Sequence, residues 1–156
     1  MKNKKSFTLI ELLVVIAVLA GFMALLVPNF MQVRIKSRDV RRKGDLKAIQ
    51  KALELYKQNQ TIPAYPATYP AVCTSLVDGN GVVYMQKVPI DPLTQCNTAG
   101  ATNYYYQRNA TDLGKYLLYA CLENRNDPDV VGCPSDFATI TGLTCTSNLC
   151  YQLTEP

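Results

Sequence analysis

Histidine and tryptophan are absent from this sequence of 156 residues. Histidine is the most frequent general base of enzymes and a frequent neutral metal ligand, so its absence speaks against most enzymatic classes. No Cys-x-x-Cys spacing, phosphate-binding glycine motif or recognisable nucleophile motif stands in its place. We therefore expect a protein that is not an enzyme, with no catalytic residues, no cofactor and no metal site.

Polar side chains are missing from a long stretch near the amino terminus, between Leu12 and Val27. With residues 7–10 and 28–31 it forms an apolar segment of about 25 residues, long enough to cross about 30 Å of hydrocarbon. The apolar part of a cleaved secretory signal is shorter. We expect a transmembrane helix over residues 7–30, with a kink at Pro28 because proline cannot donate a backbone hydrogen bond.

Glu11 is the one charged residue inside this apolar segment. A charge in hydrocarbon costs about 2.5–3.5 kcal/mol. The carboxylate therefore needs either a partner or a route to the lipid headgroups.

Positive charge gathers on both sides of the apolar segment. Three lysines precede it, and residues 34–57 carry nine Lys or Arg against three acids, in a chain of net charge +4. A bare count of these flanking charges would leave the carboxyl-terminal part in the cytoplasm. The run 34–43 has no interleaved aromatic residues for base stacking. We interpret the run as a solvated or headgroup-facing helix surface and expect no specific nucleic-acid partner.

All six cysteines follow residue 72: Cys73, Cys96, Cys121, Cys133, Cys145 and Cys150. This pattern is typical of disulfides in an oxidising compartment, where they supplement a small core. The sequence does not choose among the possible pairings. The short run CTSNLC makes Cys145–Cys150 the easiest closure, and pairing of neighbours would add Cys73–Cys96 and Cys121–Cys133.

Apolar periodicity predicts the fold class. Leu46, Ile49, Leu53 and Tyr56 recur every three or four residues, so residues 31–58 continue the helix as an amphipathic segment. Prolines make residues 59–72 a linker. Short β-rich runs then occupy residues 81–89, 103–109, 115–123 and 148–154, with a hairpin loop at 108–115. We expect an α+β protein whose long helix packs on a small antiparallel sheet within residues 73–156.

The stretch from Ser6 to Glu11, SFTLIE, follows a short lysine-rich leader. It resembles the amino-terminal signature of type IV prepilins and of the related pseudopilins of type II secretion. The resemblance implies a pilin-like fold, a leader peptide at residues 1–6, cleavage between Ser6 and Phe7, and N-methylation of Phe7. Ser6 stands where glycine is usual. The family's soluble domain lies outside, which agrees with the cysteines and not with the charge count.

Further along the chain the resemblance is less specific. The run VPIDP at residues 88–92 is similar to one in major pseudopilins, although Leu93 and Thr94 replace the Trp-Gly that usually follows. A Cys145–Cys150 bridge would resemble the carboxyl-terminal staple of many pilins. Asp127 and Asp129 are similar to the calcium loops of some pseudopilins. They lack the full acidic spacing, so an ordinary solvated turn is the favoured interpretation.

The resemblance implies a structural subunit of a type IV pilus-like filament. Such a subunit is stored in the cytoplasmic membrane as a single-pass protein with its carboxyl-terminal domain outside, then polymerised through its amino-terminal helix into an extracellular or periplasmic filament. Implied partners are further copies, minor pilins, the prepilin peptidase, the inner-membrane assembly platform and membrane lipid. Glu11 would pair with the ammonium of Phe7 on a neighbouring subunit, or with its own terminus. The alternatives are a major pseudopilin and a single-span membrane-anchored binding module.

Overall fold

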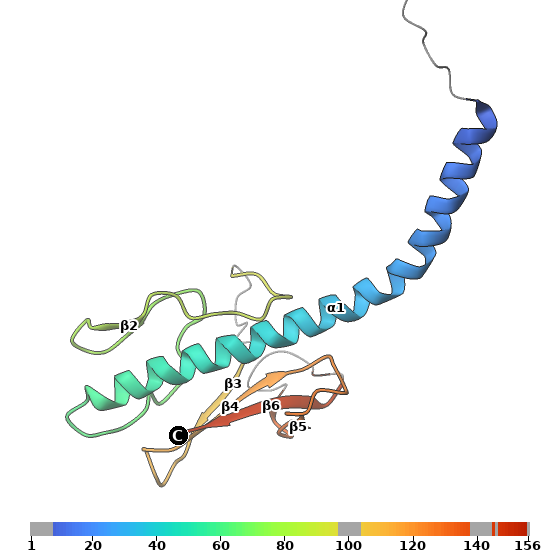
Figure 1. Cartoon of the computed structure of the whole chain (residues 1–156). Coiled ribbons are helices and arrows are strands. Elements are labelled where there is room, and N and C mark those ends of the chain that lie inside the picture. Colours follow the sequence, from blue (N-terminus) through green and yellow to red (C-terminus); the bar gives the residue numbers. More distant parts are fainter. Residues whose placement is uncertain (1–7, 97–103, 138–144, 146, 156) are drawn as a thin grey trace, which may run out of the picture. The chain divides into compact units, whose positions relative to one another are not determined.

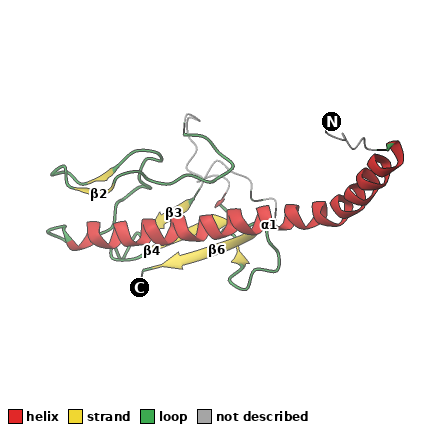
Figure 2. Ribbon diagram, turned by 45° about the horizontal axis from the view of Figure 1, so that its top comes forward, coloured by secondary structure: helices red, strands yellow, loops and turns green. Residues whose placement is uncertain are grey.

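The computed structural model describes residues 8–96, 104–137, 145 and 147–155 (Figures 1 and 2). Within them the chain forms a helix, α1 (Leu9–Gln58), and six strands. The strands are β1 (Leu76–Val77), β2 (Val83–Met85), β3 (Tyr105–Arg108), β4 (Tyr116–Cys121), β5 (Val131–Gly132) and β6 (Leu149–Thr154). The chain divides into two compact units, residues 1–36 and residues 37–156.

The first unit consists of the start of α1, whose apolar side chains are exposed. Leu9 is 81% exposed, Phe22 62% and Val33 60%. In the part of the chain that the structure describes, no helix combines the length and apolar character needed to cross a membrane. The helix continues through Pro28, and the kink at that residue stays a prediction.

The second unit packs the later part of α1 against a four-stranded antiparallel sheet of order β3-β4-β6-β5 (Figure 2). On β4, alternate side chains point into the core, since Tyr116, Leu118 and Ala120 are buried while the residues between them are half-buried. Leu46 and Leu53 of α1 are fully buried against this face. Burying a side chain of this size contributes about 1.5–3 kcal/mol, so the predicted α+β packing of the helix on the sheet is confirmed.

The hairpin of β1 and β2 lies on the other side of α1 from the sheet (Figures 1 and 2). Tyr84 of β2 packs edge-on against Tyr56 of α1, with ring centroids 5.4 Å apart, and its hydroxyl accepts a hydrogen bond from the Asn59 side chain at 2.6 Å. The end of the helix is therefore enclosed by residues from both sides. Tyr56 is half-buried in the core, as its spacing predicts.

Residues 59–72, for which the sequence suggests a linker, contain no helix or strand, and they pack against the residues that follow. The Tyr65 side chain is 1% exposed, and its ring centroid lies 4.6 Å from that of Tyr116. Its carbonyl accepts a hydrogen bond from Arg108 at 2.8 Å. The proline-rich segment is thus folded together with the strands. We call the part of the second unit that follows α1, from residue 59 onward, the head.

The disulfides correct two of the expected pairings. Cys73–Cys96 forms as predicted, but the other bridges are Cys121–Cys145 and Cys133–Cys150, in place of Cys145–Cys150 and Cys121–Cys133. The cause is strand pairing. In the β5–β6 ladder Val131 is the partner of Cys150, which brings the nearby Cys133 beside it.

Candidate functional site

Glu11 lies in the first turn of α1 and forms a reciprocal cap with Thr8. Its carboxylate accepts hydrogen bonds from the Thr8 backbone N–H at 2.9 Å and from the Thr8 hydroxyl at 2.8 Å. The Thr8 hydroxyl in turn accepts a bond from the Glu11 backbone N–H at 3.3 Å. This is a capping box, which satisfies backbone groups that a helix start leaves unpaired. The carboxylate therefore has a local structural use.

Thr8 is a residue that the sequence reasoning above missed. The motif Thr-x-x-Glu ahead of an apolar run is a known sign of a capping box, and it is present at residues 8–11. The other predicted residues of this end, Ser6 and Phe7, lie outside the described residues. Leader cleavage and methylation at that bond stay predictions.

Apolar side chains surround Glu11 on the same helix. Those that are more than half exposed are Leu9, Ile10, Leu12, Leu13, Val14, Val15, Ile16, Val18, Leu19, Phe22, Met23, Phe30, Met31 and Val33. Soluble monomers rarely expose apolar patches of this extent, and patches that do occur mark interaction surfaces. The first unit is therefore suited to lipid or to other helices.

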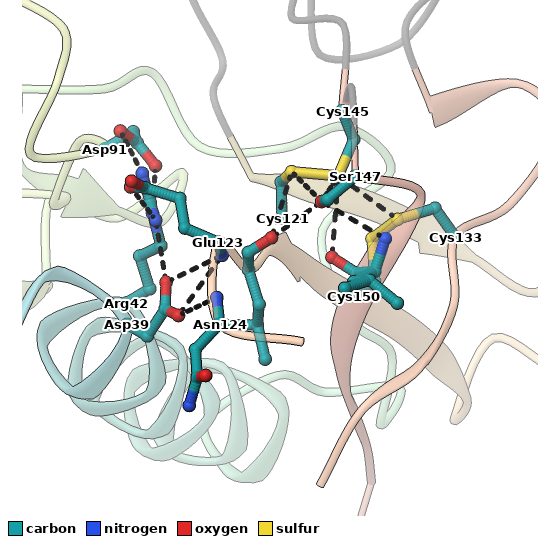
Figure 3. Close-up of a disulfide and its surroundings, with 12 residues drawn as sticks. Asp39, Arg42, Asp91, Cys121, Glu123, Asn124, Cys133, Cys145, Ser147 and Cys150 are labelled. Carbon is teal, nitrogen blue, oxygen red and sulfur yellow. Dashed lines mark hydrogen bonds and ion pairs between the residues drawn. A yellow bond between two sulfur atoms is a disulfide. The ribbon is translucent and has the colours of Figure 1, made fainter. Parts of the chain in front are cut away.

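Arg42 lies at the centre of a charged cluster that joins α1 to the head (Figure 3). The cluster is formed with Asp39, Asp91 and Glu123. Its side chain is 4% exposed, and the guanidinium donates hydrogen bonds to Asp91 at 2.6 and 3.2 Å, to Asp39 at 2.8 Å and to Glu123 at 2.7 Å. Asp91 belongs to the VPIDP run and Glu123 follows β4. One arginine thus joins α1 to two segments far away in sequence.

Asp39 completes this junction by binding backbone. Its carboxylate accepts hydrogen bonds from the backbone N–H groups of Glu123 at 3.1 Å and of Asn124 at 2.8 Å, and Arg38 donates from its Nε to the Glu123 carboxylate at 2.8 Å. The hydrogen bond from Arg38 is the main reason that the pKa of Glu123 falls to about 2, and those from Arg42 add to it although partial burial opposes the shift. Burial acts to lower the pKa of Arg42, but its acidic partners hold it above the ordinary value. Arg42 and Glu123 are therefore both charged at neutral pH.

Lys43 holds the turn that contains Asp127 and Asp129. Its ammonium bonds to the Asp127 carboxylate and, at 2.8 Å, to that of Asp129, and it lies 5.1 Å from the centre of the Tyr151 ring. The sequence favours an ordinary solvated turn at this place. That interpretation is wrong, because both acids bind a lysine. The two acids neutralise a lysine of α1.

The sequence likewise predicts a solvated or headgroup-facing surface for the basic run 34–43. This prediction is wrong for part of the run. Arg38, Arg42 and Lys43 are all bound to carboxylates of the head. Arg34 and Arg41 are exposed, as predicted. Arg41 and Arg42 share one helical turn, so the face of the helix on which a residue lies decides whether its charge is exposed.

Comparisons with known proteins identify related chains. A model described as the prokaryotic N-terminal methylation motif matches residues 1–27. The type II secretion system core protein G of Pseudomonas aeruginosa is 35% identical over 101 residues, which cover 58% of this chain and 69% of that protein. The protein of the same description from Escherichia coli K12 is 30% identical over 100 residues, covering 58% and 67%.

A pilus protein is also similar. The type IV wide pilus major component PilA4 of Thermus thermophilus is 42% identical over 57 residues, 36% of this chain and 44% of that protein. No solved structure matches the chain.

Proposed function

Because the chain belongs to the family of type IV pilins and type II secretion pseudopilins, we propose that it is a structural subunit that polymerises through α1 into a pilus-like filament. The observation that carries this proposal is the row of exposed apolar side chains along the start of α1, interrupted by Glu11. The same continuous helix supplies the core residues Leu46 and Leu53 of the head. One element therefore serves both contact between subunits and folding of the head.

A major pseudopilin of a type II secretion system is the second candidate. The core protein G relatives align over 58% of the chain, whereas the pilus relative aligns over 36%. The longer alignment favours a pseudopilus. The replacement of Trp-Gly by Leu93 and Thr94 after the VPIDP run is the departure that argues for a pilus instead.

We propose that the subunit waits in the cytoplasmic membrane as a single-pass protein, with residues 1–6 as leader and residues 7–30 as the span. Three disulfides in the head support placement on the oxidising side. Proposed partners are further copies, minor pilins, the prepilin peptidase, the assembly platform and lipid. We propose no enzymatic activity.

Glu11 is proposed to act between subunits. Cleavage after Ser6 would place an ammonium on Phe7, and the carboxylate of Glu11 on a neighbouring helix would neutralise it in the apolar filament core. The capping box does not prevent this, because a carboxylate has two oxygens and Thr8 uses Oε2. Leaving one member of such a buried pair alone costs about 3–5 kcal/mol, which is a factor of at least about a hundred in the equilibrium of subunit addition.

Three substitutions separate this role from helix capping. Glu11→Leu removes both the charge and the cap, Glu11→Gln keeps a capping side chain but removes the charge, and Thr8→Val removes the capping hydroxyl but keeps the charge. If pairing between subunits is the role, both Glu11 variants lose assembly and Thr8→Val assembles within about twofold of the native chain.

The measurement is the ratio of filament sheared from the cell to subunit left in the membrane, with leader cleavage followed by mass spectrometry. Electron microscopy of the sheared material identifies the filament. A normal ratio for Glu11→Gln, with normal cleavage, contradicts the pairing role. Loss of assembly in Thr8→Val to the same extent as in Glu11→Gln assigns the carboxylate to capping alone.

A further inference from the structure

Two of the three disulfides lie against each other beside β6 (Figure 3). The Sγ atoms of Cys133 and Cys145 are 3.5 Å apart although they belong to different bridges. The Sγ atoms of Cys133, Cys145 and Cys150 all lie within 4.8 Å of one another. With Cys121, which is bonded to Cys145, four sulfur atoms form one group.

Strand register makes a second pairing of these four cysteines available. Cys121 of β4 and Cys150 of β6 are Cα partners in the ladder but are not bonded to each other. Partners across an antiparallel ladder have Cα atoms about 4.5–5.5 Å apart and side chains on the same face, which a disulfide can join. Bridges Cys121–Cys150 and Cys133–Cys145 therefore need no strand to move.

Ser147 provides a hydrogen-bond donor at the centre of the group. Its hydroxyl lies 3.4 Å from the Sγ of Cys145 and 3.8 Å from that of Cys121, and it donates to the Leu122 carbonyl at 2.7 Å. Rotation of the hydroxyl would let it donate to a thiolate on either cysteine. A donor in this position stabilises the thiolate, the form that attacks and leaves in disulfide exchange.

We propose that Cys121, Cys133, Cys145 and Cys150 form a thiol–disulfide exchange site, in which a thiol from solution or from an oxidoreductase catalyses interconversion of the two pairings. The inference does not depend on filament assembly. Cys121, Cys133 and Cys145 are half-buried and can be approached by such a thiol, whereas Cys150 is fully buried and reacts only within the group.

The reaction proceeds in three transfers. The incoming thiolate attacks the Sγ of Cys121, forms a mixed disulfide there and releases Cys145 as a thiolate. Cys145 attacks the Sγ of Cys133 at 3.5 Å, forms Cys133–Cys145 and releases Cys150. Cys150 then attacks the mixed disulfide at Cys121, forms Cys121–Cys150 and returns the original thiolate. No electrons are gained or lost overall, and the thiol is a true catalyst.

As a consequence, non-native disulfides of the head can be exchanged for the native ones within the four-cysteine group. Loop closure favours a first bridge between cysteines close in sequence, and in the two pairings the shortest loop is that between Cys133 and Cys145, which are 12 residues apart. Exchange within the group converts that bridge to the native pairing, in which the β5–β6 ladder places Cys133 beside Cys150. The final pairing is then decided by the sheet and not by the order of oxidation.

The test uses the oxidised full chain in detergent and reduced glutathione as the catalytic thiol, at less than one equivalent. Free thiols are blocked by alkylation, and digestion with chymotrypsin, which cuts after Leu122, Phe137 and Leu149, separates the four cysteines for mass spectrometry. We expect Cys133–Cys145 and Cys121–Cys150 peptides to appear with glutathione and not without it. Cys73–Cys96 serves as the internal control. Absence of the exchanged peptides after incubation with glutathione overturns the proposal.

Variants give a second measurement. Cys133→Ser frees the Cys150 thiol beside the Cys121–Cys145 bridge, and we expect a mixture of bridges that includes Cys145–Cys150 without added thiol. The double variant Cys73→Ser/Cys96→Ser is the matched control, because it removes a bridge without leaving a free thiol and should leave the four-cysteine group in its native pairing. A pure Cys121–Cys145 bridge in Cys133→Ser overturns the proposal.

Ser147→Ala tests the hydroxyl. Loss of its hydrogen bond lowers the thiolate population about tenfold, while intrinsic nucleophilicity rises about threefold, so exchange should slow about threefold with unchanged native bridges. An unchanged rate removes Ser147 from the site.

Discussion

Arg42→Met should destabilise the head more than any other single change on the charged face of α1. Methionine fills a similar volume but carries no charge. The substitution therefore leaves the carboxylates of Asp39, Asp91 and Glu123 facing one another without the cation that neutralises them. The side chains of the first two are 2% and 6% exposed, so water cannot replace the lost partner.

The expected loss follows from this burial. Removing one partner of a buried ion pair costs about 3–5 kcal/mol, because the remaining charge stays desolvated. The free energy of unfolding of a small domain is about 5–15 kcal/mol in total. Arg42→Met should thus remove about a fifth or more of the stability and lower the melting temperature by about 10–20 °C.

The assay is thermal unfolding of the oxidised full chain in detergent, followed by circular dichroism. Lys51→Met is the matched control, since Lys51 lies exposed on the same helix and its side chain makes no hydrogen bond or ion pair with the described residues. It should change stability by less than about 0.5 kcal/mol. Adding Asp91→Asn to Arg42→Met should restore part of the loss, because one orphaned charge is removed.

The gap in stability between Arg42→Met and the native chain should narrow as the pH falls, because an orphaned carboxylate that takes up a proton no longer carries an uncompensated buried charge. Stability of Arg42→Met within about 1 kcal/mol of the native chain at neutral pH would refute the reasoning. It would mean that the three acids are solvated in solution and that the junction of α1 with the head does not depend on this arginine.

Three further predictions concern acid, processing and redox state. The pKa of Glu123 is about 2 against an ordinary 4.5, so its contribution of about 2–3 kcal/mol is complete above pH 4.5 and is lost as pH falls toward 2. When the stability of Glu123→Gln is measured as a function of pH, this loss should be absent. A pH dependence of stability identical to that of the native chain contradicts the contribution given to Glu123. The mature protein should begin at N-methylated Phe7; finding residues 1–6 in the intact mass of assembled subunits would exclude cleavage after Ser6. Alkylation without reductant should label no cysteine of correctly localised protein, and labelling of several would place the head in a reducing compartment.

Much of the fold could be predicted from periodicity because the signals are long. Leu46, Ile49 and Leu53 repeat at helical spacing, and all three are buried in the core. The runs at 103–109, 115–123 and 148–154 contain β3, β4 and β6. β1 and β5 have two residues each, too few for an alternating pattern. They exist only because a longer neighbouring segment offers a partner.

The candidate site was less predictable, for a different reason. Arg41 and Arg42 are adjacent and chemically identical, yet one is exposed and the other is buried among carboxylates. The helix turn decides which arginine faces the head, but its partners Asp91 and Glu123 lie 49 and 81 residues away. The bridges Cys121–Cys145 and Cys133–Cys150 also depend on contacts between distant segments. They require the β5–β6 ladder, which no sequence pattern predicted. Glu11 is the exception, since its cap is local and could be read from Thr8.

The position of β6 sets the timing of folding. This strand follows every other strand in the chain, yet it lies inside the sheet between β4 and β5. A chain that folds as it is synthesised, amino end first, can form the β3–β4 hairpin early, but β5 has no partner and β4 keeps an open edge until residues 149–154 are available. Such non-local pairing is slow to form. Closure of the head is then the last step of delivery, and its rate is governed by how fast the end of the chain is released. Chaperones or lipid that shield the edge of β4 during this interval would raise the yield of native subunits without altering their stability.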